Sequence, residues 1–311
     1  MIETMDLFQE IARLKKEKNA IILAHYYQNP DIQDIADHIG DSLELAKIAQ
    51  SSHADIILFA GVHFMAEGAK ILNPKSKVLL PDMRAGCSLS DSCPPQEFKK
   101  FCAQFNNPFV VSYINCSAEV KALSNIICTS SNALKIISQI PKDREIVFGP
   151  DRNLGAWLEK QTGRKMHLWQ GACIVHETFS ERKIIELQTQ YPESKLIAHP
   201  ECEESLLNQA DFIGSTSQLL KFTEQSDTQV FIVATEEGIL HQMQKKSPNK
   251  KFIPAPPTHA CACNECPFMK LNTLEKIYDV LTSEKNEMLL PEDLMFKALH
   301  PLTKMLEWST K

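Results

Sequence analysis

Short apolar runs alternate with segments of helical periodicity along most of the chain. In the first 80 residues, apolar runs bounded by polar residues are typical of buried strands, and apolar positions three and four apart are typical of helices. We expect strands at residues 20–24, 55–60 and 77–80, and helices at residues 4–16, 43–51 and 64–72. A further helix begins at Asn29-Pro30 and is expected to end at Gly40, because a polar cap with proline starts helices and glycine ends them.

The same pattern returns twice further along the chain. His25, Tyr113 and His199 stand at equivalent positions, 88 and 86 residues apart, each at the end of a predicted strand. The later copies predict strands at residues 109–113, 145–148, 166–169, 196–198, 212–213, 230–234 and 252–253, and a short apolar segment at residues 126–128. Strands alternating with helices indicate βαβ units and parallel sheets. We therefore expect an α/β fold of three αβα sandwiches related by pseudo-threefold symmetry, each with about four parallel strands, and an active site at the centre.

The repeats also set the expected division of the chain. The expected segments are residues 1–86, 87–172, 173–266 and 267–311. The first three are the αβα repeats, and the first of them includes the leading helix. The last segment breaks the alternation and predicts two helices, at residues 271–282 and 293–307, separated at Pro291. We expect these helices to pack back on the first repeat, beside its leading helix.

Polar side chains occupy equivalent positions behind the first strand of every copy. The three sets are His25, Tyr113 and His199; Tyr27, Asn115 and Glu201; and Ser42, Ser130 and Thr216. All of them lie at the carboxyl ends of predicted strands or at the helix starts that follow, where parallel sheets bind ligands. Three helix N-termini facing one centre would bind a multiply charged anion. A single serine or threonine at a helix start is usually only a cap, but three in register favour a site.

Composition excludes some classes of protein. The chain has 311 residues, 43% of them hydrophobic and 23% charged, with a formal net charge of −6. This charge argues against a nucleic-acid partner, and no apolar run reaches the roughly 18 residues of a membrane span. The first residues include acids in a helical pattern, unlike a signal peptide, so we expect a cytoplasmic protein. Ten cysteines in a reducing compartment are metal ligands, reactive thiols or core residues.

Each copy ends with a strand and a loop that carries cysteine. The first two loops carry Cys87 and Cys173, and the third carries Cys261, Cys263 and Cys266, of which the continuation CPFMKLN makes Cys266 the first choice and Cys263 the second. One thiolate from each copy would meet at the centre, and thiolates select zinc or iron–sulfur clusters. Structural zinc takes four protein ligands, so three thiolates suit a cubane cluster with one open iron, although four cysteines are usual. The cysteines without such register are expected to be ordinary small apolar residues: Cys93, Cys102, Cys116, Cys128 and Cys202.

Motifs spread over nearly the whole chain carry a family resemblance. They are AHYYQNPDIQDIADHIGDS, MRAGCSLSD, VSYINCSAEVKA, CTSSNA, WQGACIVHE, AHPEC, GSTS and CPFMKLNTL. Together they resemble the quinolinate synthases. The resemblance implies a 4Fe–4S enzyme that condenses iminoaspartate with dihydroxyacetone phosphate to give quinolinate, phosphate and water, on the de novo route to NAD. It also implies a triplicated αβα fold with the cluster buried at the centre.

The matching positions imply a set of site residues. The implied cluster ligands are Cys87, Cys173 and Cys266, although family members differ in how many cysteines surround the third. The implied substrate contacts are His25, Tyr27, Ser42, Tyr113, Asn115, Ser130, His176, His199, Glu201, Ser215 and Thr216. Proton transfers are assigned to Glu201 and Tyr27, with His25 and His199 as further candidates, and the open iron would act as a Lewis acid. The oligomeric state, the order of steps, a disulfide between Cys263 and Cys266, and transient contact with an aspartate-oxidising enzyme are left open.

Two other functions share part of this pattern. A hydro-lyase would use the same open iron on a hydroxy acid, but it gives no reason for three anion-binding helix ends. An iron–sulfur or zinc protein that carries electrons or regulates would need no substrate pocket. Metal analysis under anaerobic conditions separates zinc from iron, and a substrate-induced spectral change separates a catalytic cluster from a carrier.

Overall fold

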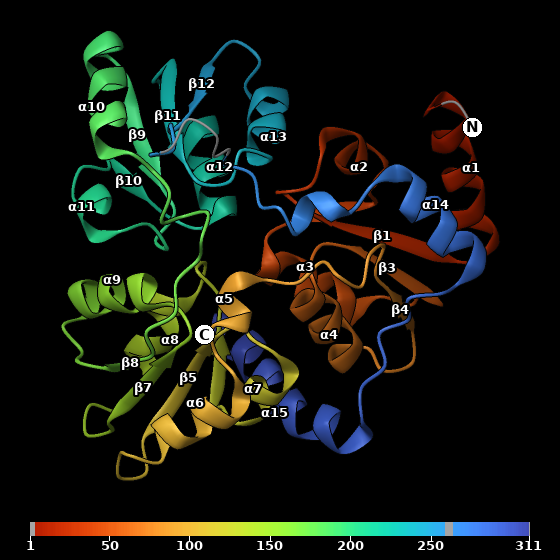
Figure 1. Ribbon diagram of the computed structural model, residues 1–311, viewed down its shortest axis with the longest axis horizontal. Helices are drawn as coiled ribbons and strands as arrows, with labels where there is room; N and C mark the ends of the chain where they lie inside the picture. Colours follow the sequence, from red (N-terminus) through yellow and green to blue (C-terminus); the bar gives the residue numbers. More distant parts are fainter. Residues whose placement is uncertain (1–3, 259–263, 311) are drawn as a thin grey trace.

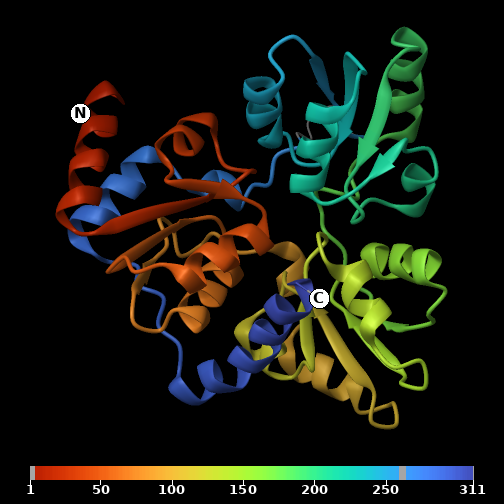
Figure 2. The same ribbon diagram turned by 180° about the vertical axis from the view of Figure 1, so that it is seen from behind.

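The computed structural model describes residues 4–258 and 264–310, and it contains three separate four-stranded sheets set around a common centre (Figure 1). The view from behind shows the same three units (Figure 2). The strand orders are β2-β1-β3-β4, β6-β5-β7-β8 and β10-β9-β11-β12, and all pairings within these sheets are parallel. In every sheet the first strand lies between the second and the third. This arrangement confirms the predicted α/β fold of three αβα units.

Strands and helices alternate in the same way in all three units. The first unit contains α1 (Thr4–Glu17), β1 (Ala20–His25), α2 (Pro30–Ile35), β2 (His38–Gly40), α3 (Ser42–Ser51), β3 (Ile56–Ala60), α4 (His63–Leu72) and β4 (Lys77–Leu79). The second contains α5 (Ser88–Asp91), α6 (Pro95–Cys102), β5 (Phe109–Tyr113), α7 (Ala118–Ala122), β6 (Ile126–Cys128), α8 (Ala133–Gln139), β7 (Ile146–Gly149), α9 (Arg152–Thr162) and β8 (His167–Leu168). The third contains α10 (Glu181–Gln190), β9 (Lys195–Ala198), α11 (Glu204–Leu207), β10 (Phe212–Ile213), α12 (Thr216–Gln225), β11 (Val230–Ala234), α13 (Ile239–Lys246) and β12 (Lys251–Pro254). A 3₁₀ turn (Met269–Leu271), α14 (Leu274–Ser283) and α15 (Glu292–Thr310) follow, and no helix within the described ranges is both long and apolar enough to cross a bilayer.

One side-chain contact begins the second strand of every unit. Asp37, Asn125 and Asp211 each accept a hydrogen bond from the backbone N–H of the residue 15 positions earlier, at 2.7, 2.7 and 2.8 Å. The N–H of each of these residues donates back to the carbonyl of the same partner. This two-way contact fixes the chain beside the first strand, so the second strand pairs in the same register in each unit.

β2 differs from the expectation that one helix continues to Gly40. α2 ends at Ile35, and Ala36 is already extended, with φ −68° and ψ 143°. Asp37 then pairs with the first strand, and this pairing outweighs the helical pattern of the preceding residues. Gly40 is required for another reason, because a Cβ there would lie 2.9 Å from the side chain of Glu44 at the start of α3.

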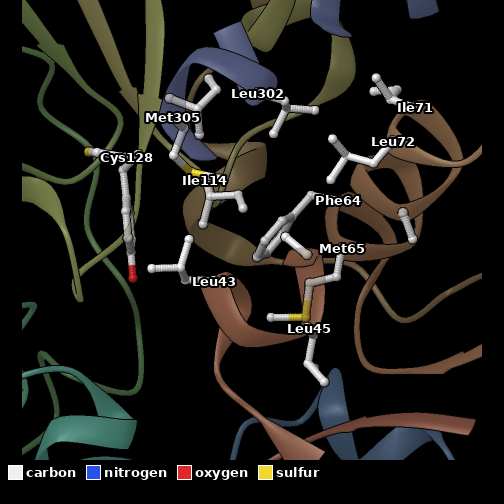
Figure 3. Close-up of a cluster of buried hydrophobic side chains, with 14 of the residues drawn as sticks. Leu43, Leu45, Phe64, Met65, Ile71, Leu72, Ile114, Cys128, Leu302 and Met305 are labelled. Carbon is white, nitrogen blue, oxygen red and sulfur yellow. The ribbon is translucent and has the colours of Figure 1, made fainter. Parts of the chain in front are cut away.

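The two C-terminal helices lie on different units. α14 runs beside α1, and Lys18 Nζ lies 2.7 Å from Glu284 Oε1 at the end of α14. α15 packs mainly on α7 and β6 of the second unit and also on α4 of the first. Its Leu302 and Met305 join Phe64 in one apolar cluster that spans both units (Figure 3). The expectation that the whole tail packs on the first unit therefore does not hold for α15, because its buried face fits the groove between two units.

Candidate active site

One cavity lies where the three units meet, lined by residues that follow β1, β5 and β9. Its volume is about 60 Å³. The predicted site residues that line it are His25, Tyr27, Ser42, Cys87, Tyr113, Asn115, Ser130, Cys173, His176, His199, Glu201, Thr216 and Cys266. Ser215 is the predicted residue that does not line the cavity, because its side chain caps α12 by accepting from the N–H of Gln218.

The helix starts at the cavity are capped by residues other than the three repeated hydroxyl residues, although one of these caps, Asp41, also lines the cavity. Asp41 caps α3, and Ser215 caps α12, each within a capping box. Ser131 joins these caps, since its hydroxyl lies 2.5 Å from the Asp41 carboxylate and 2.8 Å from the Ser215 hydroxyl. Simple capping therefore does not explain the three hydroxyl side chains that line the cavity: Ser42, Ser130 and Thr216.

A continuous series of short contacts runs along the cavity wall from Tyr27 to Glu201. The Tyr27 hydroxyl lies 3.0 Å from Thr216 Oγ1 and 2.7 Å from Thr235 Oγ1. Thr235 Oγ1 in turn lies 3.0 Å from His176 Nε2, and His176 Nδ1 lies 2.8 Å from Glu201 Oε2. Thr235 directly follows β11 and belongs to none of the polar sets that the sequence singles out.

Burial and neighbouring imidazoles set the charges of the site. Burial acts to raise the pKa of Glu201, but His176 and His199 outweigh it and hold that pKa below its ordinary value. Burial lowers the pKa of His199 to about 3 and that of His25 to about 4. Burial also raises the pKa of Tyr27 well above its ordinary value. Burial therefore favours the uncharged forms of His25, His199 and Tyr27, while the contact with His176 favours the ionised form of Glu201.

Three cysteines occupy equivalent positions in the backbone as well as in the sequence. The carbonyl two residues before each one accepts an N–H from the segment that follows the third strand: His63 N to Ala85 O at 2.7 Å, Arg152 N to Gly171 O at 2.8 Å and Glu237 N to Asn264 O at 3.2 Å. The carbonyl of each cysteine then accepts the N–H four residues further on, at 2.9, 3.1 and 3.1 Å. The cysteines that share this pattern are Cys87, Cys173 and Cys266. The pattern distinguishes Cys266 in the third loop, where Cys261 and Cys263 lie outside the described residues.

The sulfur atoms of these cysteines also share their surroundings. Burial raises the pKa of all three thiols. The backbone N–H groups two and three residues further on act in the opposite direction, because they hydrogen-bond to the sulfur and favour the thiolate. Each loop thus presents its sulfur to the cavity with two N–H donors behind it.

A second donor set shares one of these cysteines. The ligand atoms of Cys173, His176 and Glu201 all lie within 4.8 Å of one another. These are donor types that zinc accepts. Cys87 and Cys266 line the same cavity but do not belong to this group.

Comparisons with known proteins decide the family. The family model described as Quinolinate synthetase A protein matches residues 9–307. The chain belongs to the quinolinate synthase family. The curated quinolinate synthases of Nostoc sp. (strain PCC 7120) and Trichormus variabilis are each 63% identical to it, and that of Gloeothece citriformis is 62% identical, in each case over 98% of this chain and 94% of the relative. The resemblance in the motifs and the prediction of an enzyme are confirmed.

A buried ion pair holds the third cysteine segment in place. Glu236 is fully buried and accepts hydrogen bonds from the N–H groups of Cys266 (3.1 Å) and Gly238 (2.7 Å). Its other partner is Lys270, whose Nζ lies 3.1 Å away and also donates to the carbonyl of Tyr27 at 3.0 Å. Burial raises the pKa of Glu236 to about 7 against the opposing charge of Lys270. Glu236 therefore links β11, the segment after β1 and the third cysteine.

The sequence repeats carry a weak signal for Glu236. Val62, Asp151 and Glu236 occupy equivalent positions, each two residues after the third strand of its unit. Asp151 is also fully buried, and its side chain caps α9 by accepting from the N–H of Leu154. The apolar Val62 in the first unit hides this set from a search for matching polar residues.

Proposed function

We propose that this chain catalyses the condensation of iminoaspartate with dihydroxyacetone phosphate to quinolinate, phosphate and water, a step of NAD biosynthesis, with a 4Fe–4S cluster on Cys87, Cys173 and Cys266. The observation that carries the proposal is the equivalent backbone setting of three thiols around one cavity lined by polar side chains of all three units. Membership of the quinolinate synthase family supports the activity.

The three thiols fit the donor set of an iron–sulfur cluster. Thiolates are the usual protein ligands of such clusters, and N–H groups directed at the sulfur atoms are known to tune them. Three thiols are one fewer than the four irons of a cubane, which leaves one iron without a protein ligand. When bound, the cluster supplies at that iron a Lewis acid that takes up negative charge developing on the substrate.

The cavity offers hydrogen-bond donors for charged substrates. The proposed substrates carry two carboxylates and a phosphate. The N-termini of α3 and α12 and the hydroxyls of Ser42, Ser130 and Thr216 suit such anions. Among the described residues, Asn115 Oδ1 is buried without a hydrogen-bond partner, so it is placed to accept an N–H or O–H of the substrate. Tyr113, next to this position, lines the same wall.

Glu201 and Tyr27 suit opposite roles in proton transfer, one as the acceptor and the other as the donor. Glu201 is held as an anion and accepts protons, whereas Tyr27 keeps its proton and donates it. His25 and His199, uncharged at neutral pH, offer one donor and one acceptor nitrogen each. His199 Nε2 lies 3.1 Å from the Ser130 hydroxyl, which fixes the orientation of its ring beside Glu201.

A reducing location fits this chemistry. The eight described cysteines are all free thiols, and thiol ligands persist where disulfides are rare. We therefore propose a cytoplasmic enzyme. Because imines hydrolyse in water, direct delivery of iminoaspartate by an aspartate-oxidising enzyme would protect it, and this transient contact stays a prediction.

An anaerobic assay of quinolinate formation, with iron and sulfide measured on the same sample, tests the proposal. Cys87→Ala, Cys173→Ala and Cys266→Ala should each lose the cluster, whereas the control Cys102→Ala, at the end of α6, should retain it. Glu201→Gln should keep iron but lose turnover. Wild-type protein that binds zinc instead of iron, or that forms no quinolinate, would reject the function. A full cluster in Cys266→Ala would assign the third ligand to another cysteine.

A further inference from the structure

A three-way side-chain contact joins the units beside the cavity. It consists of Asp41 from the first unit, Ser131 from the second and Ser215 from the third. Ser131 Oγ lies 2.5 Å from Asp41 Oδ2 and 2.8 Å from Ser215 Oγ. Each of these residues is next in the chain to one of the three hydroxyl residues that line the cavity, Ser42, Ser130 and Thr216. The contact therefore fixes the backbone from which those hydroxyls project.

The Asp41 carboxylate sets the direction of these hydrogen bonds. A carboxylate accepts, so Ser131 donates its single hydroxyl hydrogen to Asp41. Ser215 must then donate to the Ser131 oxygen, while its own oxygen accepts the N–H of Gln218 at 3.3 Å. The other carboxylate oxygen of Asp41 accepts two N–H groups from the first turn of α3, both at 3.1 Å. Ser131 thus both donates and accepts, and it links the second unit to the two capped helices.

The first and third units share a second contact that does not involve Ser131. Ser217 Oγ on α12 lies 2.8 Å from Glu44 Oε2 on α3. Loss of the Ser131 hydroxyl would therefore leave α3 and α12 joined, but it would release the second unit from them. The cavity hydroxyl of Ser130, the preceding residue, would then lose its fixed distance from the hydroxyls of the other two units.

The Asp41 carboxylate carries a charge that is felt in the cavity. Asp41 is buried and lines the cavity wall. Burial lowers the pKa of His25, and the charge of Asp41 acts in the opposite direction. Among the described residues, the Ser131 hydroxyl is the donor that Asp41 Oδ2 has. Without this donor, the carboxylate would oppose the binding of an anion beside it.

We propose that Ser131 is a positioning residue for the anion-binding hydroxyls of the cavity. It holds Ser130 in register with the N-termini of α3 and α12, and it keeps the Asp41 carboxylate engaged while an anion binds nearby. Ser131 lines an outer groove between α3 and α12 and not the cavity, so it acts through its neighbours and does not touch the substrate. The inference rests on the proposed function for the identity of the anion. Of the proposed substrate groups the phosphate carries the largest charge, so its binding should depend most on this contact.

The variants Ser131→Ala and Ser131→Thr separate this role from simple packing. Alanine removes the hydroxyl, whereas threonine keeps it, and the outer groove leaves room for the added methyl group. Ser131→Ala should raise KM for dihydroxyacetone phosphate about tenfold, as expected for losing a hydrogen bond to a charged group, and should change kcat less than about threefold. Ser131→Thr should stay within about threefold of wild type in both constants. The matched control is Ser138→Ala, which removes an exposed hydroxyl that bonds a carbonyl of its own helix, α8. Iron content and far-UV circular dichroism control for loss of the cluster or of the fold.

Binding of inorganic phosphate gives a readout that does not depend on turnover. Titration calorimetry of the purified protein should give a phosphate Kd about tenfold higher in Ser131→Ala than in wild type, and no change in Ser138→Ala. If the wild-type protein forms no quinolinate but phosphate binding weakens in this way, the proposed function is rejected and the role of Ser131 stands. An unchanged phosphate Kd in Ser131→Ala, or a wild-type protein that binds no phosphate, would overturn the inference. It would equally be overturned if Ser131→Thr weakens binding as much as alanine does, or if kcat falls as far as KM rises.

Discussion

Shortening Leu302 to alanine should weaken the joint that α15 makes between the first and second units. Leu302 is fully buried, and it lies in the apolar cluster with Phe64 and Met305 (Figure 3). Alanine is a better helix former than leucine, so helix propensity does not oppose the change. Any loss of stability therefore reports the packing of α15 against α4 and α7.

The structure sets the size of this effect. The substitution removes three carbon atoms from a fully buried position, which costs about 0.8 kcal/mol per CH₂ group, or about 2.4 kcal/mol. A cavity that the neighbouring side chains refill only in part adds to this, and fully buried Leu→Ala changes cost about 2.7–5 kcal/mol. We expect a loss of about 3–4 kcal/mol, because the cluster draws on two units and a separate helix, which cannot all close on the gap.

Urea unfolding followed by two probes measures the loss. Trp308 lies on α15, where its ring stacks on Phe109 of β5 with 6.4 Å between centroids. In a background with Trp157→Phe and Trp169→Phe, its fluorescence reports whether α15 stays docked. Far-UV circular dichroism reports the whole fold. The matched control is Leu289→Ala, since Leu289 is 74% exposed and should leave the transition unchanged. A loss below about 1 kcal/mol for Leu302→Ala, or equal losses for both variants, would refute the view that α15 holds the units together.

Three further changes have defined outcomes. Glu236→Gln should speed the loss of iron to a chelator, because the N–H of Cys266 loses its carboxylate acceptor. The control Glu265→Gln should not, although the Glu265 carboxylate also lies near Lys270, at 3.9 Å. Hydrogen bonds from two lysines lower the pKa of Glu284 from 4.5 to about 2, so its stabilising effect is complete above pH 4.5 and is lost as the pH falls toward 2; Glu284→Gln should flatten this part of a stability–pH curve. Gly68→Ala should raise the free energy of unfolding by about 0.5–1 kcal/mol, because a Cβ at this position in α4 meets no atom within 4 Å.

The sheets could be predicted from the repeated pattern, and the error at β2 shows where that pattern is weak. Residues His38–Gly40 stand at the positions of Ile126–Cys128, predicted as a short apolar segment, and Phe212–Ile213, predicted as a strand. Asn29-Pro30 and Gly40, however, give a complete local helix signal. Strands of two or three residues carry little pattern of their own. The contact between Asp37 and the first strand decides the outcome, and it is visible only once the strands are paired.

The location of α15 could not be read from its sequence for a similar reason. Its apolar stripe predicts a buried face but does not say which surface covers it. The same limit applies to Thr235, because its partners come from separate segments. Thr235 and Glu236 stand where the other units have Gly61-Val62 and Pro150-Asp151, so no polar set marks them. The site residues that follow the first strands could be predicted from the sequence, because all three units hold polar side chains at these positions.

The cysteine set is identical in the three units, whereas the polar sets behind the first strands differ from unit to unit. The proposed ligands of these sets, a symmetric cluster and unsymmetrical substrates, account for the difference. The cysteine position is the same in all three units, down to the hydrogen bonds before and after it. A symmetric cluster needs one donor of one kind from each side, so identical residues serve it. An unsymmetrical pair of substrates does not need identical residues from the three units. Three carboxylates facing one centre would also repel one another. The position of Glu201 accordingly holds Tyr27 and Asn115 in the other units, and its single negative charge lies 2.8 Å from His176 and 4.0 Å from His199. Under the proposed function, triplication would supply the metal-binding positions, while divergence within the set of Tyr27, Asn115 and Glu201 would supply a single carboxylate for acid–base chemistry.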